Sequence, residues 1–186
     1  WRKITIKLRK TVDSALLQQT RQLGKDLFGT MGPDNEDGLF TFFKEKLSDW
    51  QSKLTGYKPL ADTGNYPGKD EIDTGLRHIS SLLNDKESYR FINRLKELKD
   101  DLLDFAEDFH DIDNFYKTQK PVWEKLRNEY ARFNLNKFEL EKDPDASVAF
   151  KRMEEILNSE TPYGIIQLAD DLIKKVSITN DNLISA

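Results

Sequence analysis

The sequence contains no cysteine among its 186 residues. A chain without cysteine has no disulfide framework, no thiolate nucleophile and no zinc site with cysteine ligands. It also has no apolar run approaching the roughly 20 residues that a membrane-spanning helix needs, and no signal peptide is visible. These absences agree with a protein of the reducing cytoplasm that does not enter a membrane. We therefore expect a cytoplasmic localisation.

The sequence begins at Trp1 without an initiator methionine and opens directly into a charged periodic segment. We therefore expect the chain to be a piece of a longer protein. Charged residues make up 33% of it and hydrophobic residues 37%, which is polar for a globular domain, although the aromatic residues supply bulk for a core. A chain of this length can form one sizeable core or two small ones.

A phosphate-binding loop is also missing, although "GNYPGKDE" at residues 64–71 has some of its features. Such a loop requires Gly, four residues, and then Gly-Lys followed by Ser or Thr. Five residues before the Gly-Lys pair the chain has Thr63, and Asp70 stands where the hydroxyl residue is required. A carboxylate there would repel phosphate oxygens. We expect a surface loop whose Asp70 opens a helix, and no cofactor site here or at the other Gly-Lys pair, Gly24 and Lys25.

Candidates for catalysis and metal binding are few, because the chain has two histidines. Glu107 and His110 have the Glu-x-x-His spacing of di-metal carboxylate sites, but such sites need a second pair and two further Glu. No Glu stands at the matching position before His78, and no Gly-x-Ser-x-Gly elbow occurs. The sequence therefore predicts no catalytic residue and no metal site. We interpret Glu107 and His110 as part of an exposed polar helix face. The alternative is that they form a weak site for a single divalent cation together with Asp111.

Charge of one sign is concentrated in two places, although the net charge is only −4. Among the charged side chains of residues 1–25, all are basic except that of Asp13. Among the charged side chains of residues 97–113, all are acidic except that of Lys99. Such blocks are usually solvated helix faces and less often docking surfaces. A basic stripe could also contact the phosphates of a nucleic acid. The candidate residues for this contact are Lys3, Lys7, Lys10, Arg21 and Lys25.

What the chain has in abundance is helical periodicity, and evidence for strands is nearly absent. We therefore predict an all-α fold, a multi-helix bundle. The first helix is expected at about residues 5–28, ended by Gly29. The second is expected to start at a cap on Asp34 or Asn35 and to end near Gly56. A short helix over about residues 70–83 follows.

The strongest pattern is a heptad stripe, in which apolar residues from Phe91 to Tyr116 follow one another at alternating spacings of four and three. It predicts one long helix over about residues 85–117. Thr118 and Pro121 are expected to end this helix and to start another that packs against it as an antiparallel hairpin. Because the stripe is rich in Phe, we expect it to be buried inside the monomer, partly against the apolar stripe of the second helix.

The last third of the chain contains the same helix-start motif twice. Asp143-Pro144 and Thr161-Pro162 each offer a helix cap followed by proline at the first helical position. The expected domain organisation is therefore a helical bundle over residues 1–140, which includes the long helix, and a helical hairpin over residues 141–186 packed on the same domain.

The segment "GYKPLADTGNYPG", residues 56–68, is predicted to be the long irregular connection of the fold. Its two prolines lower the entropy lost on ordering, and its tyrosines offer large contact area with few rotors. One interpretation is that the tyrosines fold back over the helical core. The other is that the loop docks a partner through Tyr57, Leu60 and Tyr66.

Three stretches of the chain together carry a family resemblance: "QLGKDLFGTMGPD" (22–34), "LTGYKPLADTGNYPGKDEI" (54–72) and "DDLLDFAEDFHDIDNFYKTQKPVWEKLR" (100–127). They resemble part of the P-loop ATPase-like protein of BREX bacteriophage-exclusion systems, the BrxC/PglY family. The resemblance covers about the first two thirds of the chain. It implies a large bacterial cytoplasmic defence protein whose N-terminal ATPase module, with its ATP and Mg²⁺, lies upstream of this chain.

None of the ATPase motifs implied by the resemblance matches a position in this sequence, so we expect the fragment itself not to be an enzyme and to hold no cofactor. The function that follows is a helical scaffold or assembly domain of an anti-phage ATPase. Its expected partners are other domains of that protein and other BREX components. The alternative is a helical module that contacts nucleic acid through the basic N-terminal helix.

Overall fold

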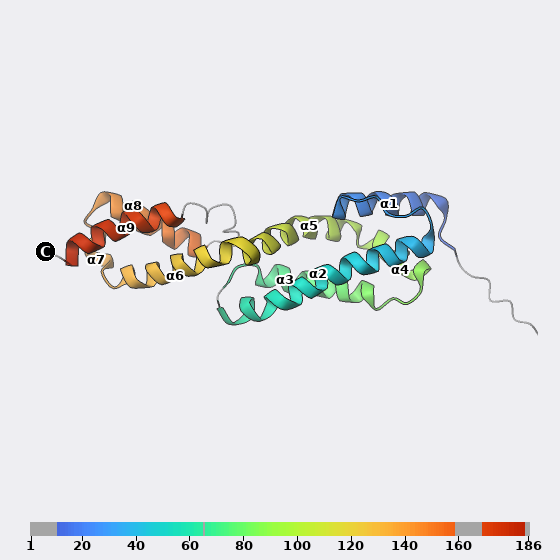
Figure 1. The fold of residues 1–186 in the computed structure, drawn as a ribbon, viewed down its shortest axis with the longest axis horizontal. Helices are drawn as coiled ribbons and strands as arrows, with labels where there is room; N and C mark the ends of the chain where they lie inside the picture. Colours follow the sequence, from blue (N-terminus) through green and yellow to red (C-terminus); the bar gives the residue numbers. More distant parts are fainter. Residues whose placement is uncertain (1–10, 65, 159–168, 185–186) are drawn as a thin grey trace, which may run out of the picture. The chain divides into compact units, whose positions relative to one another are not determined.

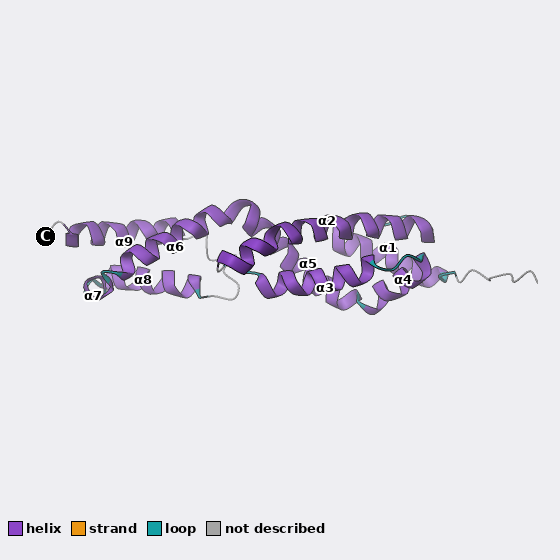
Figure 2. Cartoon of the chain, turned by 90° about the horizontal axis from the view of Figure 1, so that it is seen from below, coloured by secondary structure: helices purple, strands orange, loops and turns teal. Residues whose placement is uncertain are grey.

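The structure, a computed structural model, describes residues 11–64, 66–158 and 169–184 (Figure 1). The regular elements in these ranges are helices and none is a strand (Figure 2). The predicted all-α fold is thereby confirmed. Apolar residues recur at helical spacing, so each helix presents one stripe that must be buried against another helix.

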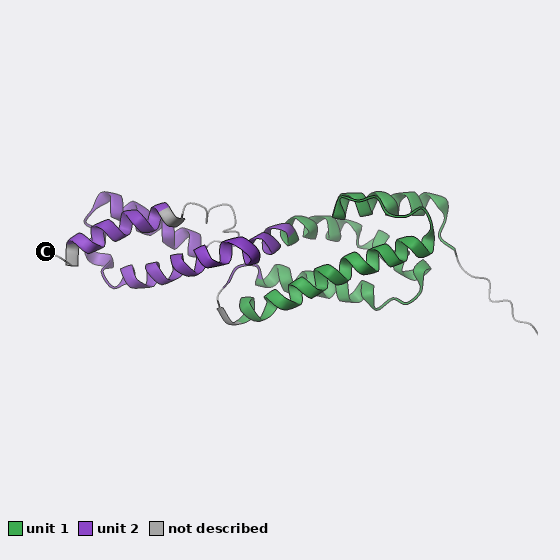
Figure 3. Cartoon of the chain, in the orientation of Figure 1, with its two compact units in different colours: residues 1–64, 69–109 green, residues 65–68, 110–186 purple. Residues whose placement is uncertain are grey.

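The chain divides into two compact units (Figure 3). The first contains residues 1–64 and 69–109, and the second contains residues 65–68 and 110–186. The chain thus crosses from one unit to the other on both sides of the short segment 65–68 and again within a helix at residues 109–110. The units are sets of residues in mutual contact. The predicted division into domains at residue 140 stays a prediction.

The first unit is built around an aromatic core. Its helices are α1 (Ser14–Phe28), α2 (Glu36–Gly64), α3 (Lys69–Leu83), α4 (Ser88–Glu97) and the beginning of α5 (Lys99–Asn114). Phe28 at the end of α1 lies edge-on to Phe43 and Trp50 of α2, with ring centroids 5.7 and 5.1 Å away. Trp50 in turn stacks on Phe109 of α5 at 4.4 Å. Each helix contributes apolar side chains that are less than one tenth exposed, among them Leu23, Leu39, Ile79, Ile92 and Leu102.

Local capping explains where the first helices begin and end. Asp13 accepts a hydrogen bond from Leu16 N–H at 2.8 Å and starts α1 later than predicted, so Val12 is not helical. Gly29 ends α1 as predicted, with a φ of 70° that glycine adopts freely. Asn35 accepts a hydrogen bond from Gly38 N–H at 2.7 Å at the start of α2, which confirms one of the two predicted caps.

Close backbone approach governs the turn between α1 and α2. Arg21 Nε donates to the carbonyl of Gly32 at 3.0 Å. A Cβ on Gly32 would lie 2.5 Å from the side chain of Leu39, and one on Gly24 would lie 2.9 Å from the ring of Phe42. Gly24 therefore has a packing role in the middle of α1.

The heptad stripe was predicted to form one long helix, but it forms two helices. α4 ends at Glu97, and Leu98 leaves the helical region before α5 begins at Lys99. The break lets the two halves of the stripe pack on different parts of α2. Phe91 of α4 lies 5.2 Å from Phe40, and Phe105 of α5 lies 5.9 Å from Trp50. The expected burial of the stripe against the second helix is confirmed by these contacts.

Pro121 lies inside a helical run and does not end it. The run consists of α5 (Lys99–Asn114), a π-helical turn η1 (Phe115–Gln119) and α6 (Lys120–Asn134). In an α-helix the proline ring clashes with the carbonyl four residues earlier, here that of Lys117. The wider π turn, in which Lys120 N–H donates to the carbonyl of Phe115, comes directly before Pro121. The predicted antiparallel hairpin at this point is therefore wrong.

The second unit continues from α6 through three more helices. These are α7 (Lys137–Leu140), α8 (Pro144–Leu157) and α9 (Ala169–Ile184). Tyr130 of α6 stacks on Phe150 of α8 at 5.0 Å and donates a hydrogen bond to Glu154 at 2.9 Å. Asn180 of α9 is buried and accepts a hydrogen bond from Asn136 at 2.8 Å. The apolar core of the unit includes Leu126, Phe133, Met153, Ile156 and Val176.

The predicted cap of α8 is confirmed, whereas Thr161-Pro162 lies outside the described residues. One carboxylate oxygen of Asp143 accepts hydrogen bonds from Asp145 N–H at 3.0 Å and Ala146 N–H at 2.9 Å, and Pro144 is the first helical residue. Asp143→Ala should lower the free energy of unfolding by about 1 kcal/mol, because two amide groups lose their acceptor. Urea denaturation followed by circular dichroism measures the change. The exposed Lys151→Ala, in the middle of α8, is the control and should cost much less.

Candidate functional site

The segment predicted to be an irregular docking loop is mostly helical. α2 continues to Gly64, with Pro59 inside it, so the predicted end of the helix near Gly56 is wrong. Tyr57 and Leu60 are half-buried on this last part of α2 in the first unit. Of the described residues of this segment, Tyr66, Pro67 and Gly68 lie outside the helices, and Gly68 has a φ of 88°. The structure therefore does not bring the three predicted docking residues together on one loop.

Tyr66 belongs to the second unit, where its side chain is engaged on several sides. Its hydroxyl donates to Glu124, and its ring lies 6.5 Å from the ring of Phe115. Lys120 Nζ and the Arg127 guanidinium lie over the same ring at 5.6 and 5.7 Å. Burial and the hydrogen bond to Glu124 raise the pKa of the Tyr66 hydroxyl. This agrees with the interpretation that the tyrosine folds back, rather than with a free docking side chain.

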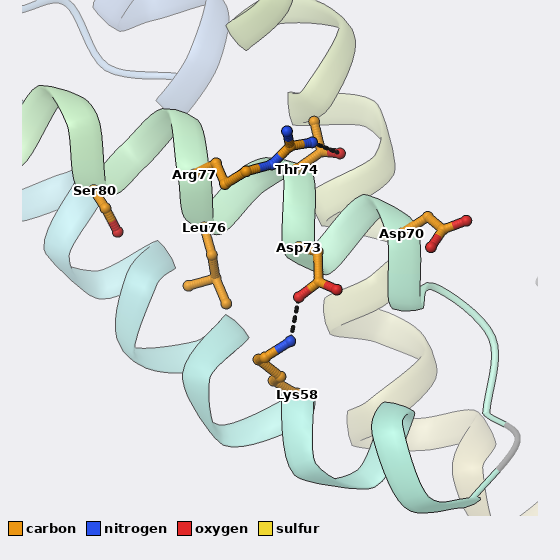
Figure 4. A pocket seen from close by; sticks show the side chains of 7 residues that line it. All are labelled: Lys58, Asp70, Asp73, Thr74, Leu76, Arg77 and Ser80. Carbon is orange, nitrogen blue, oxygen red and sulfur yellow. Dashed lines mark hydrogen bonds and ion pairs between the residues drawn. The ribbon is translucent and has the colours of Figure 1, made fainter.

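A groove between α2 and α3 carries mixed charge (Figure 4). Lys58 of α2 pairs with Asp73 of α3, and this hydrogen bond raises the pKa of Lys58 and lowers that of Asp73. Arg77 lies on α3 with its guanidinium bound to Thr74 Oγ1 at 3.0 Å. The two cations in the groove are therefore held by neighbouring side chains of the same unit. The complete lining is Lys58, Asp70, Asp73, Thr74, Leu76, Arg77 and Ser80.

A second groove, between α3 and α5, is acidic. Its walls carry Asp101 and Asp104 from α5 and Asp70 and Glu71 from α3, and the buried Phe105 forms part of its floor. Several carboxylates that line one groove create a negative potential, which attracts cations and basic side chains. Within the part of the chain that the structure describes, no group of three or more possible ligands is arranged to hold a metal ion.

Of the described residues considered for metal or nucleic-acid binding, Arg21 is hydrogen-bonded within the protein, and the others are exposed. Glu107 and His110 are both exposed on α5. Arg21 is held by the Gly32 carbonyl and by Gln18 at 3.2 Å, whereas Lys25 is exposed in the last turn of α1. The other three basic candidates, Lys3, Lys7 and Lys10, lie outside the described residues. Nucleic-acid contact through this stripe stays a prediction.

The two most exposed large apolar side chains among the described residues lie where α6 ends and α7 begins. Leu135 is 86% exposed and Phe138, three residues later at the start of α7, is 73% exposed. This pair was not predicted from the sequence. A signal was present, because both residues lie in "NLNKFEL", where the spacing of apolar residues that continues through Phe133 is lost. Val148 of α8 and Ile178 of α9 are also exposed, at 70% and 65%.

Among residues 11–64, 66–158 and 169–184, none of the helices combines the length and the apolar composition that a bilayer span requires. No solved structure matches the chain. A family model does match it, over residues 16–137, and its description is the alpha helical domain of the BREX ATP-binding protein BrxC. The match covers about the part of the chain that carries the resemblance noted in the sequence. It ends within α7, so α8 and α9 lie beyond it. The chain belongs to the BREX BrxC family and contains its alpha helical domain.

Proposed function

We propose that this chain is a non-catalytic assembly domain of the cytoplasmic BREX ATP-binding protein. Membership in the family supports a role in the BREX system, because the matching model describes an alpha helical domain of that protein. Several acidic side chains of α5 are exposed, and no nucleotide-binding motif occurs in the sequence. ATP and Mg²⁺ belong, in this proposal, to another part of the parent protein. The fragment alone should therefore show no ATP hydrolysis.

The observation that carries the assembly role is the exposed pair Leu135 and Phe138. Contiguous exposed apolar surface is typical of places where another protein binds, and these two side chains are the most exposed large apolar ones among the described residues. The occupant we propose is another domain of the same ATP-binding protein, because a helical domain of a large protein has its sister domains at high effective concentration. Tyr57 and Leu60, which are half-buried on α2, remain a second candidate surface, and the Tyr66 hydroxyl donates a hydrogen bond to Glu124.

Replacing the pair with serine, as L135S/F138S in this chain expressed apart from the rest of the parent protein, should abolish its capture of the remaining domains when these are supplied as a separate polypeptide. The helical circular dichroism and the melting temperature should stay unchanged, because both side chains are exposed. V148S/I178S is the matched control, since it removes two other exposed apolar side chains from the same unit.

Equal loss of capture in both double variants would mean that general surface hydrophobicity, and not the Leu135 and Phe138 pair, drives binding. Undiminished capture by L135S/F138S would remove the basis for the assembly surface at this end of α6.

A further inference from the structure

The π turn before Pro121 leaves a weak point in the helical run of the second unit. Pro121 has no N–H, so one carbonyl of the preceding turn lacks its helical partner. Prolines and π turns are the usual places where long helices bend. Two buried side-chain atoms near this turn, Gln119 Oε1 and Trp123 Nε1, also have no hydrogen-bond partner. The run from α5 to α6 therefore needs support from outside the helix at this point.

The segment directly before α3 supplies contacts on the N-terminal side of the proline. Tyr116, within the π turn, donates a hydrogen bond from its hydroxyl to the carbonyl of Pro67 at 3.2 Å. The ring of Tyr66 lies 6.2 Å from the ring of Tyr116 and 6.5 Å from that of Phe115. The aromatic side chains of η1 are thus packed against this short segment.

The same segment supplies contacts on the C-terminal side of the proline. The Tyr66 hydroxyl donates to Glu124, whose carboxylate also pairs with Lys120 Nζ at 3.3 Å. The Arg127 guanidinium, one turn further along α6, lies over the Tyr66 ring. A hydrogen bond to a charged acceptor is stronger than one between neutral groups, and the cations over the ring add to it.

We propose that Tyr66 and Pro67, with Tyr116 and Glu124, form a brace that limits bending of the helical run at Pro121. One aromatic side chain contacts residues on both sides of the proline, so bending there would pull Tyr66 away from Phe115 or from Glu124. The four residues belong to the second unit. The brace gives a structural role to the Gly- and Pro-rich stretch that resembles a phosphate-binding loop without being one.

The brace can be tested by measuring with two spin labels how much the helical run bends, because the sequence has no cysteine to interfere with labelling. Asp111→Cys and Asn128→Cys place two spin labels at exposed positions of α5 and α6, about 25 Å apart along a straight helix. We expect a single narrow distance distribution in the otherwise unchanged chain. Tyr66→Ala should lose it and give a broad distribution that extends to shorter distances. Tyr66→Phe, which lacks only the hydrogen bond to Glu124, should broaden it less.

Repeating the Tyr66→Ala substitution in a Pro121→Ala variant distinguishes a bracing role of Tyr66 from a general loss of packing. Pro121→Ala restores the missing N–H, so the helix no longer needs the brace, and Tyr66→Ala in this background should keep the narrow distribution. Tyr130→Phe is the matched control, since it removes another tyrosine–glutamate hydrogen bond of the same unit and should leave the distribution unchanged.

The proposal is overturned if Tyr66→Ala leaves the distribution narrow. It is equally overturned if Pro121→Ala does not reduce the effect of Tyr66→Ala, because Tyr66 then contributes only to packing. Should Tyr66→Ala fail to fold by circular dichroism, the comparison of Tyr66→Phe in the two backgrounds decides in the same way.

Discussion

Phe105→Ala should lower the free energy of unfolding by about 3–5 kcal/mol, the range typical of large aromatic side chains truncated in a core. Phe105 is 4% exposed and lies on α5 between Trp50 of α2 and Phe109, with ring centroids 5.9 and 6.2 Å away. Its removal takes away apolar contact with both rings and leaves a cavity that these large, rigid neighbours cannot fill. Urea denaturation followed by the helical circular dichroism signal measures the loss.

Leu103→Ala on the same helix is the control for Phe105→Ala. Leu103 is only half-buried, so its truncation should cost about 1 kcal/mol. An unchanged unfolding curve for Phe105→Ala together with loss of self-association would show that this side chain packs between molecules, and burial inside the monomer would then be the wrong interpretation.

Gly75→Ala should destabilise the protein by about 1–3 kcal/mol, although alanine favours a helix over glycine by about 1 kcal/mol. A Cβ on Gly75 of α3 would lie 2.1 Å from Cζ of Phe105 and 2.4 Å from its Cε2. The ring cannot move aside easily, because Trp50 lies on another side of it. The added methyl group therefore forces α3 and α5 apart or drives the ring out of its preferred rotamer.

The contact between Gly75 and Phe105 can be isolated with a double-mutant cycle. Phe105→Leu shortens the side chain and makes room for a methyl group. The double variant G75A/F105L should therefore cost less than the sum of the two single changes. Gly56→Ala in α2 is the matched control, because a Cβ there meets no atom within 4 Å. It should stabilise the protein by up to about 1 kcal/mol. Additive costs in the cycle would contradict the close approach of the two helices.

Chemistry within a few residues was enough to predict several element ends. Gly29 ends α1 because it adopts a positive φ without cost, and Asn35 and Asp143 cap helices with their own side chains. The periodicity of apolar residues likewise predicted an all-helical fold, since each helix carries its own buried stripe. These features depend on the local chain alone, so the sequence by itself determined them.

The two prolines within helices show what only the tertiary structure decided. A proline in a helix interior costs about 3 kcal/mol, and judged locally both Pro59 and Pro121 predict an end. The helix beyond Pro59 is kept because Ala61 is buried and because Lys58, one residue before the proline, pairs with Asp73 of α3. The run across Pro121 is kept by a π turn and by the burial of Trp123 on its far side.

The candidate site was predicted least well, because it too depends on contacts between residues that are distant in the sequence. Tyr66 was predicted as a docking residue from composition, but Glu124, which accepts its hydrogen bond, is 58 positions away in the sequence. Leu135 and Phe138 were missed because exposure depends on which neighbours fold over a side chain. Residue type and spacing determined that the chain is helical, and they determined some of the helix caps. The free energy of contacts between distant residues decided which helices continue past a proline and which side chains remain exposed.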